Sequence, residues 1–163
     1  MRNATRHAGS AFAGPRLAAG LLAAALLASG AWAGAARADT LPVRGHFMAE
    51  GKAAGAGSHV KGHVSGSFDT GSDVLSYTVT YSGLSGPVVA AHFHGPAAPG
   101  VSAGVLQPIP APYDSPIKGE VTLTADQAAD LTKGLVYVNL HTAANPMGEA
   151  RAQLHLGRHH HHG

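Results

Sequence analysis

The chain has 163 residues, no cysteine and a formal net charge of +2 with neutral histidines. Its positive charge is concentrated in the first 38 residues, which hold four of the eleven Lys and Arg and none of the nine Asp and Glu. The remaining chain therefore has seven basic and nine acidic residues, a net charge of −2, which excludes an extended basic face for binding nucleic acid. The lack of cysteine excludes a disulfide framework and any paired-cysteine metal site.

Residues 1–38 are predicted to be a secretory signal peptide. Three arginines precede an apolar run of leucine and alanine that is short for a membrane span, and two Ala-x-Ala sites follow it. The arginines are Arg2, Arg6 and Arg16, the apolar run covers 17–28, and the two sites end at Ala33 and Ala38. We expect cleavage after Ala38, so that the mature chain begins at Asp39, or at Gly34 if the earlier site is used. The protein is then periplasmic or secreted, with no membrane span in its mature form.

Short strand-like segments separated by Gly, Pro and Ser make up the rest of the chain. The clearest is 73–82, where apolar residues alternate with Ser and Thr. The other predicted strands are 41–48, 59–68, 88–94, a short one near 105–106, 117–123, 135–141 and 149–156, and the run 51–57 is predicted to be flexible. Six prolines between Gly95 and Pro116 indicate a long connection, because proline lacks the N–H that a central strand donates. A capping box at Thr124 predicts one helix over about 125–133. The pattern favours an all-β fold, an antiparallel β-sandwich with one short helix.

The strand 88–94 is the most distinctive stretch, because it ends in two histidines and then breaks at Gly95. Strict alternation places Val88, Ala90, His92 and His94 on one face and Val89, Ala91 and Phe93 on the other. Two imidazoles at i and i+2 can converge on one metal ion, and His141 offers a third at the end of another apolar run. Imidazole ligation suits copper or zinc, and three such ligands leave a coordination position open. The alternative interpretation is that these histidines bond backbone or carboxylate groups at the strand ends.

Residues close to the histidines in the sequence are candidates for supporting the site. Asn139 shares a strand face with His141 and is predicted to orient a ligand by a hydrogen bond, whereas Tyr137 on that face is predicted to pack. Glu149 and Arg151 are i, i+2 neighbours, expected to form an ion pair or hydrogen-bond network that secures the last strand to the turn before it. Other histidines are expected to be solvated, and spacing selects no fourth ligand among them: His46, His59 and His63.

The C-terminal segment 157–163 is rich in histidine, with four consecutive histidines before a final glycine. Such a tract binds copper, nickel or zinc loosely. We interpret it as a natural tail, because a purification tag is usually longer and does not end in glycine.

Catalytic motifs do not support an enzyme. Gly100–Gly104 matches the nucleophile-elbow pattern, but the prolines at 108, 110 and 112 exclude the helix that must follow it. No phosphate-binding loop and no HExxH sequence occurs. We therefore predict no catalytic residue.

Three motifs of the chain resemble the CHRD domain, which is named from chordin and also occurs in exported bacterial proteins. They are Ala91-His92-Phe93-His94-Gly95-Pro96-Ala97, Tyr137-Val138-Asn139-Leu140-His141-Thr142 and Asn145-Pro146-Met147-Gly148-Glu149-Ala150-Arg151. The resemblance covers about residues 41–156 and implies one CHRD domain over 39–156. The chain departs from the family in having Ala152 where glycine usually follows the arginine. Bacterial members are mostly of unknown function, so the resemblance implies no particular activity.

A fainter resemblance is to copper–zinc superoxide dismutase. Gly83-Leu84 followed by His92-Phe93-His94 is similar to the copper-binding strand of that enzyme, and 148–151 is loosely similar to its arginine region. This resemblance implies a Greek-key, superoxide-dismutase-like sandwich. The chain has no histidine between Gly95 and Leu140 and no cysteine, so the zinc-binding loop is missing, which argues against dismutase chemistry.

The main hypothesis is an exported CHRD-domain protein that binds copper or zinc through His92, His94 and His141. Its role would be binding or buffering of metal in the bacterial envelope rather than catalysis. A second hypothesis is a non-metal adhesion or protein-interaction module whose partners are envelope or extracellular proteins. A third is a dismutase-like redox enzyme. Nucleic acid is not an expected partner.

Overall fold

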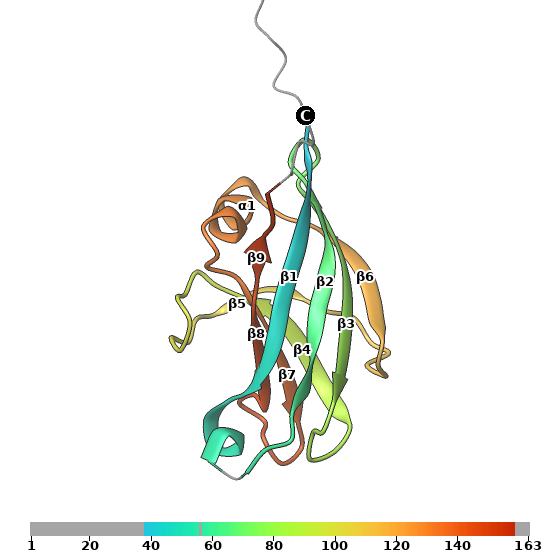
Figure 1. Ribbon diagram of the computed structural model, residues 1–163, viewed down its shortest axis with the longest axis vertical. Helices are drawn as coiled ribbons and strands as arrows, with labels where there is room; N and C mark the ends of the chain where they lie inside the picture. Colours follow the sequence, from blue (N-terminus) through green and yellow to red (C-terminus); the bar gives the residue numbers. More distant parts are fainter. Residues whose placement is uncertain (1–37, 56, 159–163) are drawn as a thin grey trace, which may run out of the picture. The chain divides into compact units, whose positions relative to one another are not determined.

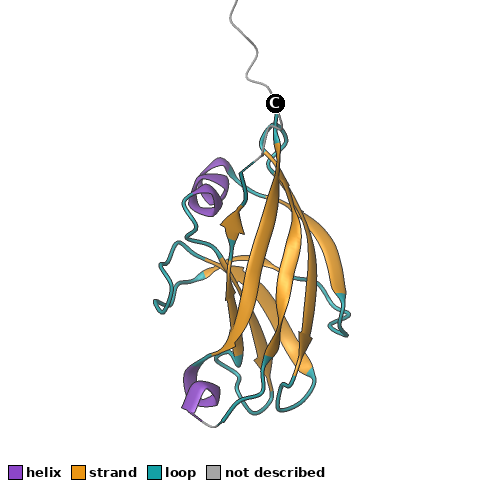
Figure 2. Ribbon diagram, viewed as in Figure 1, coloured by secondary structure: helices purple, strands orange, loops and turns teal. Residues whose placement is uncertain are grey.

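The computed structural model describes residues 38–55 and 57–158, which form nine β-strands, one α-helix and one 3-10 helix (Figures 1 and 2). In chain order the elements are β1 (Thr40–Ala49), η1 (Gly51–Gly55), β2 (Lys61–Asp69), β3 (Val74–Ser82), β4 (Val88–His94), β5 (Val105–Pro108), β6 (Ile117–Thr122), α1 (Ala125–Thr132), β7 (Tyr137–Thr142), β8 (Ala150–Gln153) and β9 (His155–Leu156). The predicted signal peptide, except Ala38, and the four histidines of the tail lie outside the described residues. No helix in the described part is long and apolar enough to span a membrane.

The strands form one antiparallel sheet in the order β5-β4-β7-β8-β1-β2-β3-β6. The sheet has two halves that share β1: one contains β2, β3 and β6, and the other contains β8, β7, β4 and β5. Strand β1 pairs with β2 along one edge and with β8 and β9 along the other. The chain leaves β3, builds the β4–β5 hairpin in the other half and returns as β6 beside β3; it then crosses again to place β7 beside β4. In Figure 1, β1, β2 and β3 cross in front of β4 and β7. The predicted all-β, antiparallel fold with one short helix is confirmed.

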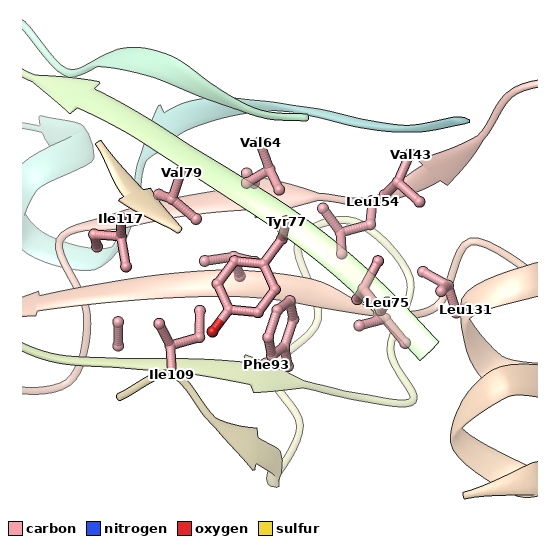
Figure 3. Close-up of a cluster of buried hydrophobic side chains, with 14 of the residues drawn as sticks. Val43, Val64, Leu75, Tyr77, Val79, Phe93, Ile109, Ile117, Leu131 and Leu154 are labelled. Atoms are coloured by element: carbon pink, nitrogen blue, oxygen red, sulfur yellow. The ribbon is translucent and has the colours of Figure 1, made fainter. Parts of the chain in front are cut away.

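The two halves bury their apolar faces against each other (Figure 3). In β3 the predicted alternation holds, because Leu75, Tyr77 and Val79 are buried while the residues between them are half-buried. Tyr77 meets Phe93 of β4 edge to face, with ring centroids 5.1 Å apart, and so joins the two halves directly. Each buried side chain of this kind stabilises the fold by about 1.5–3 kcal/mol. Core burial therefore takes the place of disulfides in this cysteine-free chain.

Helix α1 begins where its capping box predicts. The hydroxyl of Thr124 accepts the backbone N–H of Gln127, and the side chain of Gln127 accepts the N–H of Thr124. The chain leaves the helix through Gly134, whose φ of +73° favours glycine. Gln127 also donates to the carbonyl of Leu106, which attaches the short strand β5 to the helix.

The prediction of a flexible run over 51–57 is wrong for residues 51–55. These residues form the 3-10 helix η1, in which Ala53 is buried and donates its N–H to the carbonyl of Glu50. The turn starts at Gly51 with φ +57°, which glycine adopts without strain. A run of Gly and Ala carries no hydrophobic periodicity, so the sequence pattern did not reveal the helix.

Strand β4 departs from strict alternation at its start. Its register against β7 shifts between Val88 and Ala90, so Val88 is buried whereas Val89 is 55% exposed. A bulge adds one residue and reverses the phase of the side chains. The predicted shared face of Val88 and the histidines is therefore wrong. Beyond the bulge the prediction holds, with Ala91 and Phe93 in the core and His92 and His94 on the outer face.

Candidate metal centre

The outer faces of β4 and β7 bring three histidines together. In the register of the two strands, His92 lies opposite Asn139, His94 opposite Tyr137, and His141 opposite Ala90. Directly paired residues of antiparallel strands project to the same face of the sheet. The three imidazoles therefore share the face that is turned away from the core, where each is half-buried.

The ring nitrogens are close enough to share one metal ion. One nitrogen from each ring lies within 4.8 Å of the other two, and Nδ1 of His92 is 3.2 Å from Nε2 of His141. Two nitrogen ligands on a tetrahedral zinc, at about 2.0–2.1 Å from the metal, are about 3.3–3.4 Å apart. The His92–His141 pair has nearly this spacing, but without a metal the same 3.2 Å contact is a hydrogen bond, in which Nδ1–H of His92 donates to Nε2 of His141. A shared ion would replace that bond, and His94 would need to approach by about 1.5 Å or less.

Two backbone carbonyls determine which ring nitrogen of His94 and of His141 keeps its lone pair. Nδ1 of His94 lies 3.0 Å from the carbonyl oxygen of Ala103, and Nδ1 of His141 lies 3.0 Å from that of Pro146. A carbonyl oxygen only accepts hydrogen bonds, so both Nδ1 atoms carry the proton and both Nε2 atoms keep a lone pair. Metal-binding histidines usually make this second hydrogen bond.

The Nε2 atom of His94 is buried and has no hydrogen-bond partner among the described residues. A buried acceptor without a partner costs about 1–3 kcal/mol, so each such atom in a native protein needs an explanation. A metal ion at this lone pair would supply the missing partner. A purely structural role for His94, in contrast, leaves the nitrogen unexplained.

The surroundings favour the neutral form of the imidazoles. Burial lowers the pKa of His92, and repulsion from charge on His141 and His94 lowers it further. Burial also lowers the pKa of His94 below its usual value, although the hydrogen bond to Ala103 and the charge of Glu50 act in the opposite direction. Neutral imidazole is the form that binds a metal, so His92 and His94 are ready to do so at neutral pH.

Asn139 lies beside His92 in the neighbouring strand and is oriented by Glu50, a residue that sequence reasoning missed. The Nδ2 group of Asn139 donates to Oε2 of Glu50 at 2.5 Å. Because a carboxylate only accepts, this bond fixes the amide and leaves its Oδ1 buried without a donor among the described residues. The amide packs on Gly148, where an added Cβ would collide with it. Among the described residues Asn139 bonds Glu50 and no histidine, so its role in orienting a ligand stays a prediction.

Glu149 and Arg151 do not pair with each other. The carboxylate of Glu149 accepts hydrogen bonds that secure the turn before β8, from the N–H and hydroxyl of Ser85 and from the side chains of Thr142 and Asn145. Arg151 lies 3.7 Å from Glu50 instead. Of the two predicted alternatives, the hydrogen-bond network is present and the ion pair between Glu149 and Arg151 is not. Glu149 precedes β8 and is bonded by the turn, whereas Arg151 lies within β8 on the outer face of the sheet.

Tyr137 is 2% exposed and packs as predicted, but its contacts are with the site. Its ring is stacked on His94, with centroids 5.1 Å apart and planes within 8°. Sequence reasoning also missed the carbonyls of Ala103 and Pro146, because backbone acceptors have no signature in the residue type.

The other histidines singled out in the sequence, all of them in the described part of the chain, are not members of the cluster. His46, His59 and His63 are exposed, in agreement with the prediction that they are solvated. Within residues 38–55 and 57–158, no second group of three His, Cys, Asp or Glu side chains is close enough to hold a metal ion. The described chain therefore offers one candidate metal site, with three protein ligands.

The fold and the cluster together define an antiparallel β domain that carries three histidines on the outer face of its sheet. The family model of the CHRD domain matches residues 45–154, nearly the whole of this domain. The chain therefore belongs to the CHRD domain family. No curated protein and no solved structure matches it significantly.

Proposed function

We propose that the protein is exported and that its mature form binds one copper or zinc ion through His92, His94 and His141. The buried Nε2 of His94, which has no partner in the described chain, is the observation that carries this proposal. The 3.2 Å distance between Nδ1 of His92 and Nε2 of His141 is close to that of two ligands on one ion and supports it, as do the carbonyls that leave Nε2 of His94 and of His141 as acceptors.

The chemistry of the donor set limits the metals. Imidazole nitrogens suit copper and zinc, whereas calcium and magnesium prefer oxygen ligands. Three protein ligands leave a position for water or another small ligand. Asn139 is paired with His92 across the two strands, and its Oδ1, which has no donor among the described residues, is an acceptor that a protic ligand could use. Because no catalytic motif accompanies the histidines in the sequence, we propose a binding or buffering role in the envelope rather than catalysis.

Calorimetric titration of copper and zinc into protein lacking His159–His162 tests the proposal. The wild type should bind about one equivalent in the domain itself. His92→Ala and His141→Ala should weaken binding at least about ten-fold, because even the loss of a group that only supports a ligand costs about 10–100-fold. His59→Ala removes an exposed histidine as the matched control and should bind like the wild type.

Equal binding by all four proteins would mean that the histidines are structural. The adhesion or protein-interaction hypothesis would then replace the metal-binding one. Binding that is lost with the tail alone would lead to the same conclusion, because it would place the metal on residues 159–162.

A further inference from the structure

The segment from Ala97 to Gly104, called the strap below, is part of the connection from β4 to β5 (Figure 1). Hydrogen bonds tie it to β8 and to His94. Side chains of β8 hold its backbone. Arg151 donates to the carbonyl of Val101 at 2.7 Å and to that of Ala98 at 3.0 Å. Gln153 donates to the carbonyl of Ala97 at 2.9 Å. The strap therefore depends on side chains for its position over the sheet.

Arg151 also begins a stack that ends at the metal site. Its guanidinium carbon lies 3.5 Å from the centre of the Tyr137 ring, and the same ring is stacked on His94. The hydroxyl of Tyr137 accepts the N–H of Ala103 at 3.0 Å. The carbonyl of Ala103 in turn accepts a hydrogen bond from Nδ1–H of His94. Tyr137 and Ala103 thus connect Arg151 to His94 by two routes.

We propose that Arg151 is a positioning residue of the metal site, which holds the strap so that the Ala103 carbonyl keeps the proton of His94 on Nδ1. This inference deepens the proposed function and rests on it for the role of His94 as a ligand. The planar guanidinium presents several N–H donors in a fixed fork, and two of them reach carbonyls three residues apart in the strap. Arg151 also donates to Oε1 of Gln153 at 2.8 Å, and Gln153 itself bonds the strap at Ala97. The ion pair with Glu50 is longer, at 3.7 Å, so the hydrogen bonds of Arg151 go to the strap and to a side chain that also holds the strap.

Backbone hydrogen bonds to the rest of the described chain attach the strap at its ends. The N–H of Ala97 donates to Leu135, and the carbonyl of Gly104 accepts from Gly95. If the middle of the strap moves, the Ala103 carbonyl leaves Nδ1 of His94, and the proton is free to move to Nε2. A protonated Nε2 has no lone pair for a metal. Loss of Arg151 should therefore change the tautomer of His94 and weaken metal binding together.

Nuclear magnetic resonance of metal-free protein lacking His159–His162 tests the inference, because long-range ¹⁵N–¹H correlations show which nitrogen of His94 is protonated. The wild type should show the Nδ1–H tautomer. Arg151→Lys should mix in the Nε2–H tautomer and should weaken zinc binding about ten-fold in a competition titration. Arg44→Lys changes an exposed arginine of β1 in the same way, as the matched control, and should change neither quantity.

A folded Arg151→Lys protein with the wild-type tautomer and zinc affinity would overturn the inference. If that variant does not fold, Tyr137→Phe decides the question, because it removes only the hydroxyl that bonds Ala103. A shift towards the Nε2–H tautomer in Tyr137→Phe supports the inference, and an unchanged tautomer overturns it. The tautomer is measured without metal, so a wild type that binds no zinc would refute the proposed function separately.

Discussion

His94 and His141 show how backbone atoms give a short sequence motif its chemistry. Each ring donates through Nδ1 to a carbonyl, that of Ala103 or that of Pro146, and thereby keeps Nε2 as an acceptor. The spacing of His92 and His94 predicts only that the two side chains share a face. Carbonyls in two separate loops then select the tautomer, so the position of each lone pair is a property of the fold.

The histidines should make the stability of the metal-free protein depend on pH. The pKa values of His92 and His94 lie below 6.5, mainly through burial, so the unfolded chain takes up protons before the folded protein does. Their contribution to the free energy of unfolding should be complete above pH 6.5 and should be lost as the pH falls through the lower folded-state pKa values. Urea unfolding of the wild type and of His94→Gln measures this contribution. A stability difference between them that does not change over this pH range would contradict the prediction.

Glu149 should be among the most sensitive polar residues, because it is 3% exposed and its carboxylate accepts several hydrogen bonds. Glu149→Gln presents an amide N–H₂ to groups that are themselves donors, and it should lower the free energy of unfolding by about 2–4 kcal/mol. Burial acts to raise the pKa of Glu149, but the hydrogen bonds from Ser85, Thr142 and Asn145 outweigh it and lower the pKa overall.

The effect of Glu149→Gln should therefore be largest above pH 4.5, the ordinary pKa of the group, and should shrink as the pH falls through the lower folded-state value. Denaturant unfolding at a pH well above 4.5 and at a pH below the folded-state pKa of Glu149 measures this effect. Glu120→Gln, at an exposed position in β6, is the matched control and should change little. Similar losses in the two variants would show that the Glu149 network does not secure the turn.

At the scale of strands and helices, hydrophobic alternation predicted most of the fold. It located β3 and β4 and showed which of their side chains enter the core, because a half-buried strand places alternate residues on its two faces. It missed the bulge at Val89, since an inserted residue leaves no mark in composition. Alternation also predicted a single final strand over 149–156, whereas the structure has two strands, β8 and β9. Leu154 separates them, because its N–H donates to the carbonyl of Val136 and not to β1.

The candidate site was predictable where it depends on alternation within two strands. Alternation alone places His92 and His94 on one face of β4, and the pairing of β7 with β4 then brings His141 to them. Glu50 does not, because it lies beyond the end of β1, and only the pairing of β1 with β8 and of β8 with β7 brings it to Asn139. Tertiary register of this kind cannot be derived from the local pattern of a single sequence.

The turn between β7 and β8 should tolerate no side chain at Gly148. Its φ of +122° is strained for other residues, and an added Cβ would collide with the amide of Asn139. Gly148→Ala should lower the free energy of unfolding by about 1–3 kcal/mol, as measured by denaturant unfolding. Gly86→Ala, where no heavy atom lies within 4 Å of the added Cβ, is the control. Equal stability of both variants would contradict the packing described here.

In the whole molecule, one face of β4 and β7 packs in the core and the other carries the histidine cluster. Phe93 and Leu140 point into the core, where both are fully buried, while His92 and His141 stand on the outer face. A substitution at a histidine should therefore leave the packing between the two halves of the sheet intact. This separation allows metal binding to be tested without unfolding the domain.

Export should remove the N-terminal segment. The arginines, the apolar run and the Ala-x-Ala sites of residues 1–38 predict a mature N-terminus at Asp39 or Gly34. Mass spectrometry of the protein recovered from the envelope fraction measures this directly. An intact form that begins at Met1 and remains in the cytoplasm would contradict the prediction.

The central claim is that three histidines of one sheet face hold a metal ion. Anomalous diffraction at the zinc or copper absorption edge, from crystals of metal-loaded protein lacking His159–His162, tests it most directly. We expect one strong anomalous peak among the rings of His92, His94 and His141, at about 2.0–2.1 Å from Nε2 of His94 and of His141. Metal bound elsewhere on the surface, with the His94–Ala103 and His141–Pro146 bonds intact and nothing between the three rings, would contradict it.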